Sequence, residues 1–284
     1  MHRLVTGVLL LGWALPANAH GAGELARDWV FWLLLITLSW YVTGLVGGGH
    51  APARWRPVLF FSGWALLAVA LVGPVEHWAH ASLAGHMTQH MILLAAAPPL
   101  LLLARPMPQL MQALPGAARR RLGPPMGRLY GATAATPLLA FVVHGLVIWL
   151  WHFPTPYQLA LQHRLLHDLE HATFLFTGLW FWWSLIAPGR SGRAGFGLAC
   201  ILAVLTLMHT GMLGALMTFA PQLLYPEHPA GFAGFDALSD QQLAGLLMWV
   251  PGGFIYGAAA LALAGVWLLR TEKNELDRKS GETA

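Results

Sequence analysis

The chain has 284 residues, of which 57% are hydrophobic and 10% are charged, whereas soluble domains contain about 25% charged residues. This composition excludes a water-soluble globular protein. The net charge of +4 does not indicate a nucleic-acid-binding protein, because the basic residues form no patch. The single cysteine, Cys200, excludes an internal disulfide, a CxxC redox pair and a thiolate metal cluster.

The N-terminus has the pattern of a secretory signal peptide. Arg3 precedes an apolar run from Leu4 to Leu15, and residues 16–19 (PANA) end in an A-x-A cleavage pattern. We predict that residues 1–19 are a cleaved signal peptide and that the mature chain begins at His20. The alternative is an uncleaved eighth span, but the apolar run is short for one.

Seven longer apolar stretches follow, each close to the length of about 20 residues that crosses a bilayer. They are Trp29–Val46, Trp55–Gly73, Ala84–Ala104, Ala132–Trp151, Leu169–Ala187, Gly195–Ala220 and Leu243–Leu269. We predict an all-α, polytopic membrane helical bundle with seven transmembrane helices. Residues 20–269 form this membrane domain, and residues 270–284 form a charged cytoplasmic tail.

The basic residues predict the orientation of the bundle. If the first span begins outside, almost every Lys and Arg of residues 20–284 lies on one side, and only Arg27 and Arg164 lie on the other. The positive-inside rule assigns the first side to the cytoplasm. We therefore expect a multi-pass protein surrounded by the lipid bilayer, with an acidic outer face that attracts cations.

Histidine is the most informative residue type in this chain. There are 14 histidines, and ionisable groups in membrane spans usually face the bundle interior or a polar cavity. All but His2 and His50 map to the outer loops or to the outer halves of spans. This clustering predicts a histidine-rich site on the outer side of the membrane.

The spacing of these histidines predicts metal ligands on several helices. His86 and His90 lie one turn apart on one face of the third span, and we expect them to face the interior near His167 or His171 and His209. The sequence also places Asp168 and Glu170 beside the stripe of histidines that starts the fifth span. The candidate metal ligands are His77, His80, His86, His90, His152, His163, His167, His171, His209 and Met212.

The ligand types favour copper over zinc. Imidazole with thioether is a combination that suits copper, especially Cu(I), when cysteine is absent, whereas a zinc site gives no reason for methionine. Haem b in a membrane electron carrier is an alternative, since His90, His144 and His209 could supply axial ligands from different spans. A metal-free protein, with histidines that only pack, is a third hypothesis.

Four segments in a fixed order carry a resemblance to a known family. They are GHMTQHMILLAAAPPLLLLARP, WHFPTPYQLAL with LHDLEHATFLFTGLWFWW, MHTGMLGALMTFA, and LSDQQLAGLLMWVPGG. Together they resemble the polytopic CtaG family of cytochrome c oxidase assembly factors, from about Trp29 to Leu269.

The resemblance implies a role in forming active oxidase around its copper centres, and it marks His86, His90, His152, His167, His171, His209 and Asp240. We therefore predict a bacterial inner (plasma) membrane assembly factor, not an enzyme, that binds or delivers copper at a periplasm-facing His/Met site. The alternative in this family is a metal-free scaffold for the insertion of an oxidase subunit. Its expected partners are cytochrome c oxidase subunits and the copper ion.

Overall fold

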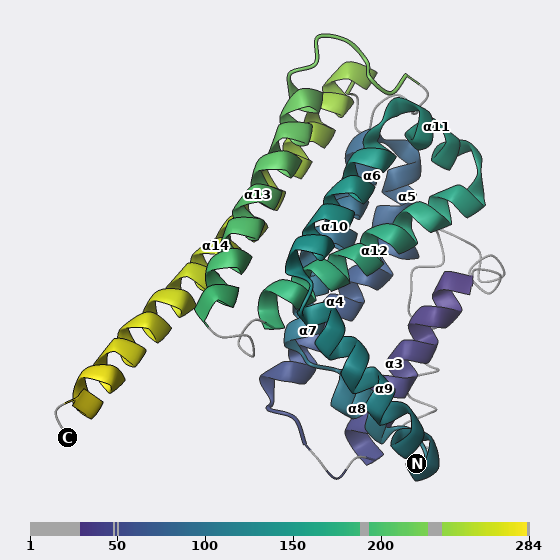
Figure 1. Cartoon of the computed structure of the whole chain (residues 1–284). Coiled ribbons are helices and arrows are strands. Elements are labelled where there is room, and N and C mark those ends of the chain that lie inside the picture. Colours follow the sequence, from purple (N-terminus) through teal and green to yellow (C-terminus); the bar gives the residue numbers. More distant parts are fainter. Residues whose placement is uncertain (1–28, 48, 50, 188–192, 227–234, 283–284) are drawn as a thin grey trace.

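The computed structural model describes residues 29–47, 49, 51–187, 193–226 and 235–282, and all regular elements in these ranges are helical (Figure 1). The helices are α3 (Trp29–Gly47), α4 (Trp55–Leu71), α5 (Pro74–Ala81), α6 (Leu83–Met91), the π-helical segment η1 (Ile92–Ala96), α7 (Ala97–Leu103), α8 (Met107–Gln112), α9 (Gly116–Ala134), α10 (Pro137–His152), α11 (Pro154–Gln162), α12 (Arg164–Ile186), α13 (Arg193–Thr218) and α14 (Ala237–Glu282). The predicted signal peptide and His20 lie outside the described residues.

The described part of the chain has five helical segments that are long and apolar enough to cross a membrane, or six if α9 and α10, bent by 79°, are counted as one span. The prediction of an all-helical, multi-pass membrane protein is confirmed, whereas the prediction of seven spans is not. When α9 and α10 are counted as one span, the structure has one candidate span fewer than the seven predicted, and the missing one is the fifth. That segment is helical as α12, but polar residues such as Glu170 and His171 lower the hydropathy of its first half.

The fourth predicted span begins later than expected. We predicted its start at Ala132, but α9 ends at Ala134 and α10 begins at Pro137. Proline restricts the residue before it to non-helical conformations, and Thr136 has φ −121° and ψ 51°. Pro137 therefore separates the two helices and allows the bend between them.

The third span contains the π-helical segment η1, where a distant tryptophan satisfies a backbone carbonyl. Pro98 and Pro99 lack backbone N–H groups, so neither can donate to the carbonyl of Leu94 in an α- or π-helical pattern. The indole Nε1 of Trp182, on α12, donates to this carbonyl at 3.0 Å. The hydrogen bond satisfies a buried acceptor and fixes α12 against the third span.

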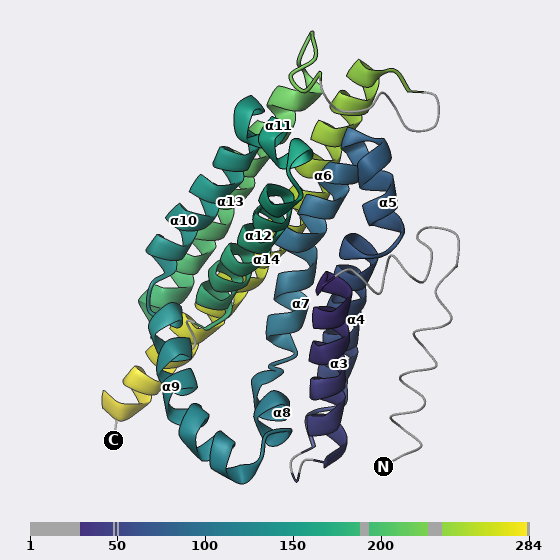
Figure 2. The same cartoon turned by 90° about the vertical axis from the view of Figure 1, so that its right-hand side faces the viewer.

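The C-terminal helix pair packs closely along the side of the bundle. Helix α14 contacts α13 and α6, while α12 contacts α10 and α7 (Figures 1 and 2). A Cβ atom added to Gly245 would lie 2.5 Å from the carbonyl oxygen of Gly214, so the approach of α13 and α14 requires glycine. The predicted tail continues α14 as helix to Glu282, and this end extends beyond the bundle (Figure 1).

Candidate metal centre

Two helices bring four buried polar side chains together at the end of the bundle where α5 and α11 lie. His86 and His90 come from α6, and Glu170 and His171 come from α12. One ligand atom of each residue lies within 4.8 Å of those of the other three. The exposed fractions are 2% for His86, 0% for His90, 0% for Glu170 and 8% for His171. We call these four residues the His₃Glu cluster.

The rings of the His₃Glu cluster surround the carboxylate of Glu170. The ring centroid of His90 lies 4.3 Å from that of His86 and 5.7 Å from that of His171. The Nε2 atoms of His90 and His86 lie 3.5 Å and 3.9 Å from the carboxylate oxygens of Glu170. Three imidazoles and one carboxylate thus converge on a small volume.

Three residues of this cluster, His90, Glu170 and His171, carry buried polar atoms without an ordinary hydrogen-bond partner among the described residues. Within the described ranges, no hydrogen bond satisfies the Glu170 carboxylate, either ring nitrogen of His90, or Nε2 of His171. A buried carboxylate is costly unless it is paired or coordinates a metal. A cation would satisfy the carboxylate and the imidazole lone pairs together, so the residues fit a metal ion with three nitrogen ligands and one oxygen ligand.

Aromatic and apolar side chains enclose the His₃Glu cluster. The Phe174 ring lies 4.7 Å from that of His90, and the Tyr157 ring lies 5.4 Å from that of His86. Met87 and Met91 are buried on α6, but Met91 points toward α14, where its methyl group would lie 2.7 Å from a Cβ added to Gly252. The four residues that define the cluster include no methionine.

Local hydrogen bonds position α6 so that its histidines face inward. The Ser82 hydroxyl accepts a hydrogen bond of 2.9 Å from the amide of Gly85, as expected of an N-cap residue. The Gln89 side chain donates to the carbonyl of Ala70 at 2.7 Å, and it also donates to the carboxylate of Glu76. These contacts hold α6 against α4 and α5.

Further imidazoles lead from the His₃Glu cluster to the surface. The His167 ring lies 4.1 Å from that of His171 and 6.4 Å from that of His80. The side chain of His80 is 65% exposed, and its Nε2 lies 3.1 Å from Glu76 Oε1. Burial lowers the pKa of His167, so this ring is neutral near pH 7 and offers a nitrogen lone pair to a cation.

His152 lies beside the cluster on α10. Its ring centroid is 5.6 Å from that of His90. Its Nδ1 lies 2.7 Å from the carbonyl oxygen of Ile148, and since a carbonyl can only accept, Nδ1 carries the proton. The other nitrogen, Nε2, is therefore the one with a lone pair.

The structure does not bring the other predicted ligands into the cluster. His77 and His163 are exposed, and Met212 is 53% exposed. His209 lies against α10 at the level of Gly145, where an added Cβ would lie 3.6 Å from its Nε2. This level is seven residues, or roughly 10 Å along the helix, from His152, and His209 is not among the four residues of the cluster.

A family model agrees with the arrangement of these segments. The model for the cytochrome c oxidase caa3 assembly factor (Caa3_CtaG) matches residues 29–270. The chain belongs to this family. The resemblance to the polytopic CtaG family is thereby confirmed, and the family is one of assembly factors rather than of enzymes. No curated protein and no solved structure matches the chain.

Glu170 lies within the segment that matches the caa3 assembly factor family, but the sequence pattern alone predicted no ligand role for it. The pattern indicated this residue only as an acidic neighbour of the histidine stripe. Glu170 is completely buried, and it lies three residues after His167, on the same helical face. An acidic residue inside a predicted span, next to a histidine stripe, was the signal that could have identified it.

Proposed function

We propose that this caa3 assembly factor binds one copper ion in the His₃Glu cluster and holds it for delivery to an oxidase subunit. The observation that carries the proposal is the convergence of three buried imidazoles and one buried carboxylate within 4.8 Å. The positive-inside bias supports a position in the periplasmic half of the membrane. His80 and His167 would guide the ion from the exposed end of the bundle to the cluster.

The ligand atoms of the cluster favour copper for a different chemical reason than the ligand types in the sequence did. The sequence favoured Cu(I) because of methionine, but the His₃Glu cluster has no thioether. Three imidazoles and a carboxylate instead suit a divalent ion, and nitrogen and oxygen ligands bind Cu²⁺ most tightly among the divalent first-row metals. Zinc, which accepts the same ligands in a tetrahedral site, is the competing metal.

Membership in an oxidase assembly family supports copper over zinc as the cargo. An assembly factor acts on an oxidase during its maturation, and a buried copper site would protect the ion until transfer. In this role the chain only binds and releases the ion. Glu170 neutralises part of its charge, while His86, His90 and His171 fix its position.

Metal analysis of the purified full-length protein in detergent tests this proposal. The protein is loaded separately with Cu²⁺ and Zn²⁺, freed of unbound metal, and examined by elemental analysis, electron paramagnetic resonance and optical spectroscopy. We expect one Cu²⁺ per chain, with nitrogen coupling from imidazole. His90→Ala should lose this signal, and His163→Ala, an exposed histidine outside the cluster, should retain it.

Several results would overturn the proposal. They are a wild-type protein that binds no Cu²⁺, equal copper binding by wild type and His90→Ala, a clear preference for zinc, and an optical spectrum dominated by a haem Soret band.

A further inference from the structure

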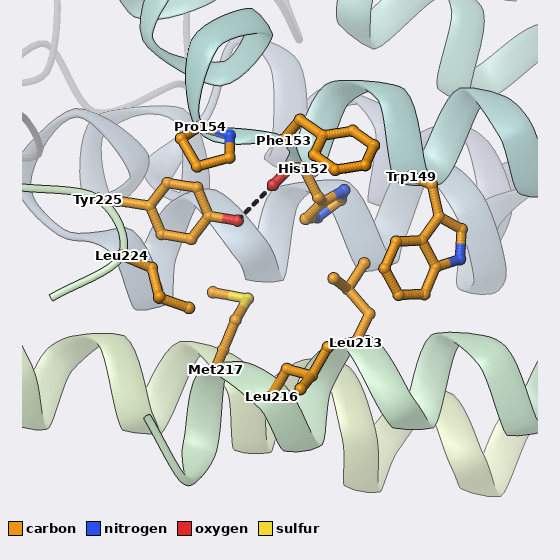
Figure 3. Close-up of a pocket in the computed structure, with 9 residues that line it drawn as sticks. All are labelled: Trp149, His152, Phe153, Pro154, Leu213, Leu216, Met217, Leu224 and Tyr225. Atoms are coloured by element: carbon orange, nitrogen blue, oxygen red, sulfur yellow. Dashed lines mark hydrogen bonds between the residues drawn. The ribbon is translucent and has the colours of Figure 1, made fainter. Parts of the chain in front are cut away.

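A cavity of about 160 Å³ lies next to the His₃Glu cluster, between the end of α10, helix α13 and the chain that follows α13 (Figure 3). Its lining is mostly apolar and includes Trp149, Leu213 and Leu224. The lining also includes an imidazole, His152, and a thioether, Met217, both of which are groups that can bind a metal ion. The volume exceeds the roughly 30 Å³ that one water molecule occupies in the liquid, so a metal ion fits.

Both donor side chains are buried and reach the cavity from opposite walls. His152 is 4% exposed and Met217 is 1% exposed, and in Figure 3 their side chains extend from the two helices into the space between them. In the described part of the chain, Nε2 of His152 has no hydrogen-bond partner. Because Nδ1 carries the proton, this buried Nε2 offers its lone pair.

The charge of the lining determines which ion the cavity suits. The lining contains no acidic side chain, unlike the cluster with Glu170. The cost of moving an ion from water into an apolar environment rises with the square of its charge, so a monovalent ion costs about a quarter as much as a divalent one. Imidazole with thioether is also the neutral donor pair that suits Cu(I).

We propose that His152 and Met217 form a second, Cu(I)-selective site in this cavity, separate from the divalent-ion site of the His₃Glu cluster. Cu(I) binding in this cavity does not depend on the proposed function. The use of the cavity to pass copper to an oxidase subunit does rest on the proposed function. The two sites differ in the charge of their ligands, so the protein can hold copper in either oxidation state without a redox step of its own.

The cavity lies between the cluster and the surface, so a Cu(I) ion bound in it can be released to a partner without entering the cluster. The His152 ring lies 5.6 Å from that of His90 on one side. On the other side, Phe153 and Leu216 line the cavity with exposed fractions of 57% and 55%. A partner that approaches this rim would reach the ion through Met217 and His152 rather than through the enclosed cluster.

A tyrosine holds the wall of the cavity in place. The hydroxyl of Tyr225 donates a hydrogen bond of 2.6 Å to the carbonyl of His152. Burial raises the pKa of Tyr225 to about 12, so the hydroxyl keeps its proton at neutral pH. The amide of Leu224 donates to Gln241 on α14 at 2.6 Å. The chain after α13 is thus tied to both α10 and α14.

The test is an anaerobic Cu(I) titration of the full-length protein in detergent, in competition with a chromophoric Cu(I) chelator, followed by X-ray absorption of the bound copper. We expect wild type to bind Cu(I) with one sulfur ligand. Met217→Leu, which conserves volume, should lose the sulfur scattering and weaken Cu(I) binding at least tenfold. Met212→Leu is the matched control on the same helix, and it should behave as wild type.

The same titration in the His90→Ala background separates this proposal from the proposed function. Cu(I) binding with sulfur should persist there, while the Cu²⁺ resonance of the cluster is lost. Absence of the Cu²⁺ signal in wild type would refute the cluster site and leave the cavity site standing. The cavity proposal fails if wild type binds no Cu(I), if the bound Cu(I) has no sulfur ligand, or if Met217→Leu binds Cu(I) as wild type does.

Discussion

The carboxylate of Asp240 accepts a hydrogen bond of 2.7 Å from the backbone amide of Leu83, which lies 157 positions earlier in the chain. Leu83 is the first residue of α6, and the first amides of a helix have no partner within it. Asp240 on α14 therefore caps the helix that carries His86 and His90. This contact gives a physical role to Asp240, which the family resemblance marked without a mechanism.

Loss of this cap should affect both stability and metal binding. We expect Asp240→Ala to lower the free energy of unfolding by about 1–3 kcal/mol, because it leaves a buried amide without an acceptor. It should also reduce the Cu²⁺ affinity of the cluster by moving His86. Thermal unfolding in detergent and a copper titration measure the two effects. Asp240→Asn keeps an oxygen acceptor and should retain more of both properties than the alanine variant.

Glu170 should matter for the metal more than for the fold. Glu170→Gln keeps the shape but removes the negative charge, so we expect Cu²⁺ affinity to fall at least tenfold. The metal-free variant should be at least as stable as wild type, since an uncompensated buried charge is costly.

Titration calorimetry with Cu²⁺ and thermal unfolding without metal test these two expectations. Asp168→Asn is the control, because Asp168 lies at the boundary, where it accepts a hydrogen bond of 3.3 Å from Trp29. Equal Cu²⁺ affinity in Glu170→Gln and wild type would remove Glu170 from the ligand set.

Oxidase maturation in cells should depend on the His₃Glu cluster. His90→Ala and His171→Ala are each expected to remain in the membrane while oxidase activity falls, and added copper should restore part of that activity. Oxidase activity per amount of assembly factor, measured with an antibody against the factor, gives the comparison. Exposed His163→Ala should support wild-type activity. Full activity in a well-expressed His90→Ala strain would contradict a copper role.

The contact between α13 and α14 should tolerate no side chain at its closest point. Gly245→Ala places a Cβ 2.5 Å from the Gly214 carbonyl and 2.6 Å from the Thr218 amide. Such overpacking costs about 1–3 kcal/mol, so the melting temperature should fall. Gly253→Ala on the same helix meets no atom within 4 Å and should stabilise the protein by about 0.4–1 kcal/mol. A stable Gly245→Ala variant would show that the two helices can separate without cost.

The sequence by itself determined the class of the protein and the local geometry of its ligands. Long apolar stretches require helices in a membrane, because only a helix or a closed barrel satisfies its backbone there. The four-residue spacing of His86 and His90, and of His167 and His171, places each pair on one helical face. The order of the motifs was also sufficient to identify the family.

Only the tertiary structure decided which of these residues meet. Periodicity defines the faces of one helix but not the rotation of that helix against its neighbours, which depends on packing between residues far apart in sequence. That rotation turns Met217 inward and Met212 outward on α13, and it places His209 beside α10 near Gly145. The packing of α12 against the third span also brings Glu170, for which the sequence predicted no ligand role, close to the imidazoles of α6. One contact between these two helices is the hydrogen bond from Trp182 to the carbonyl of Leu94, which the prolines after η1 leave without a helical donor.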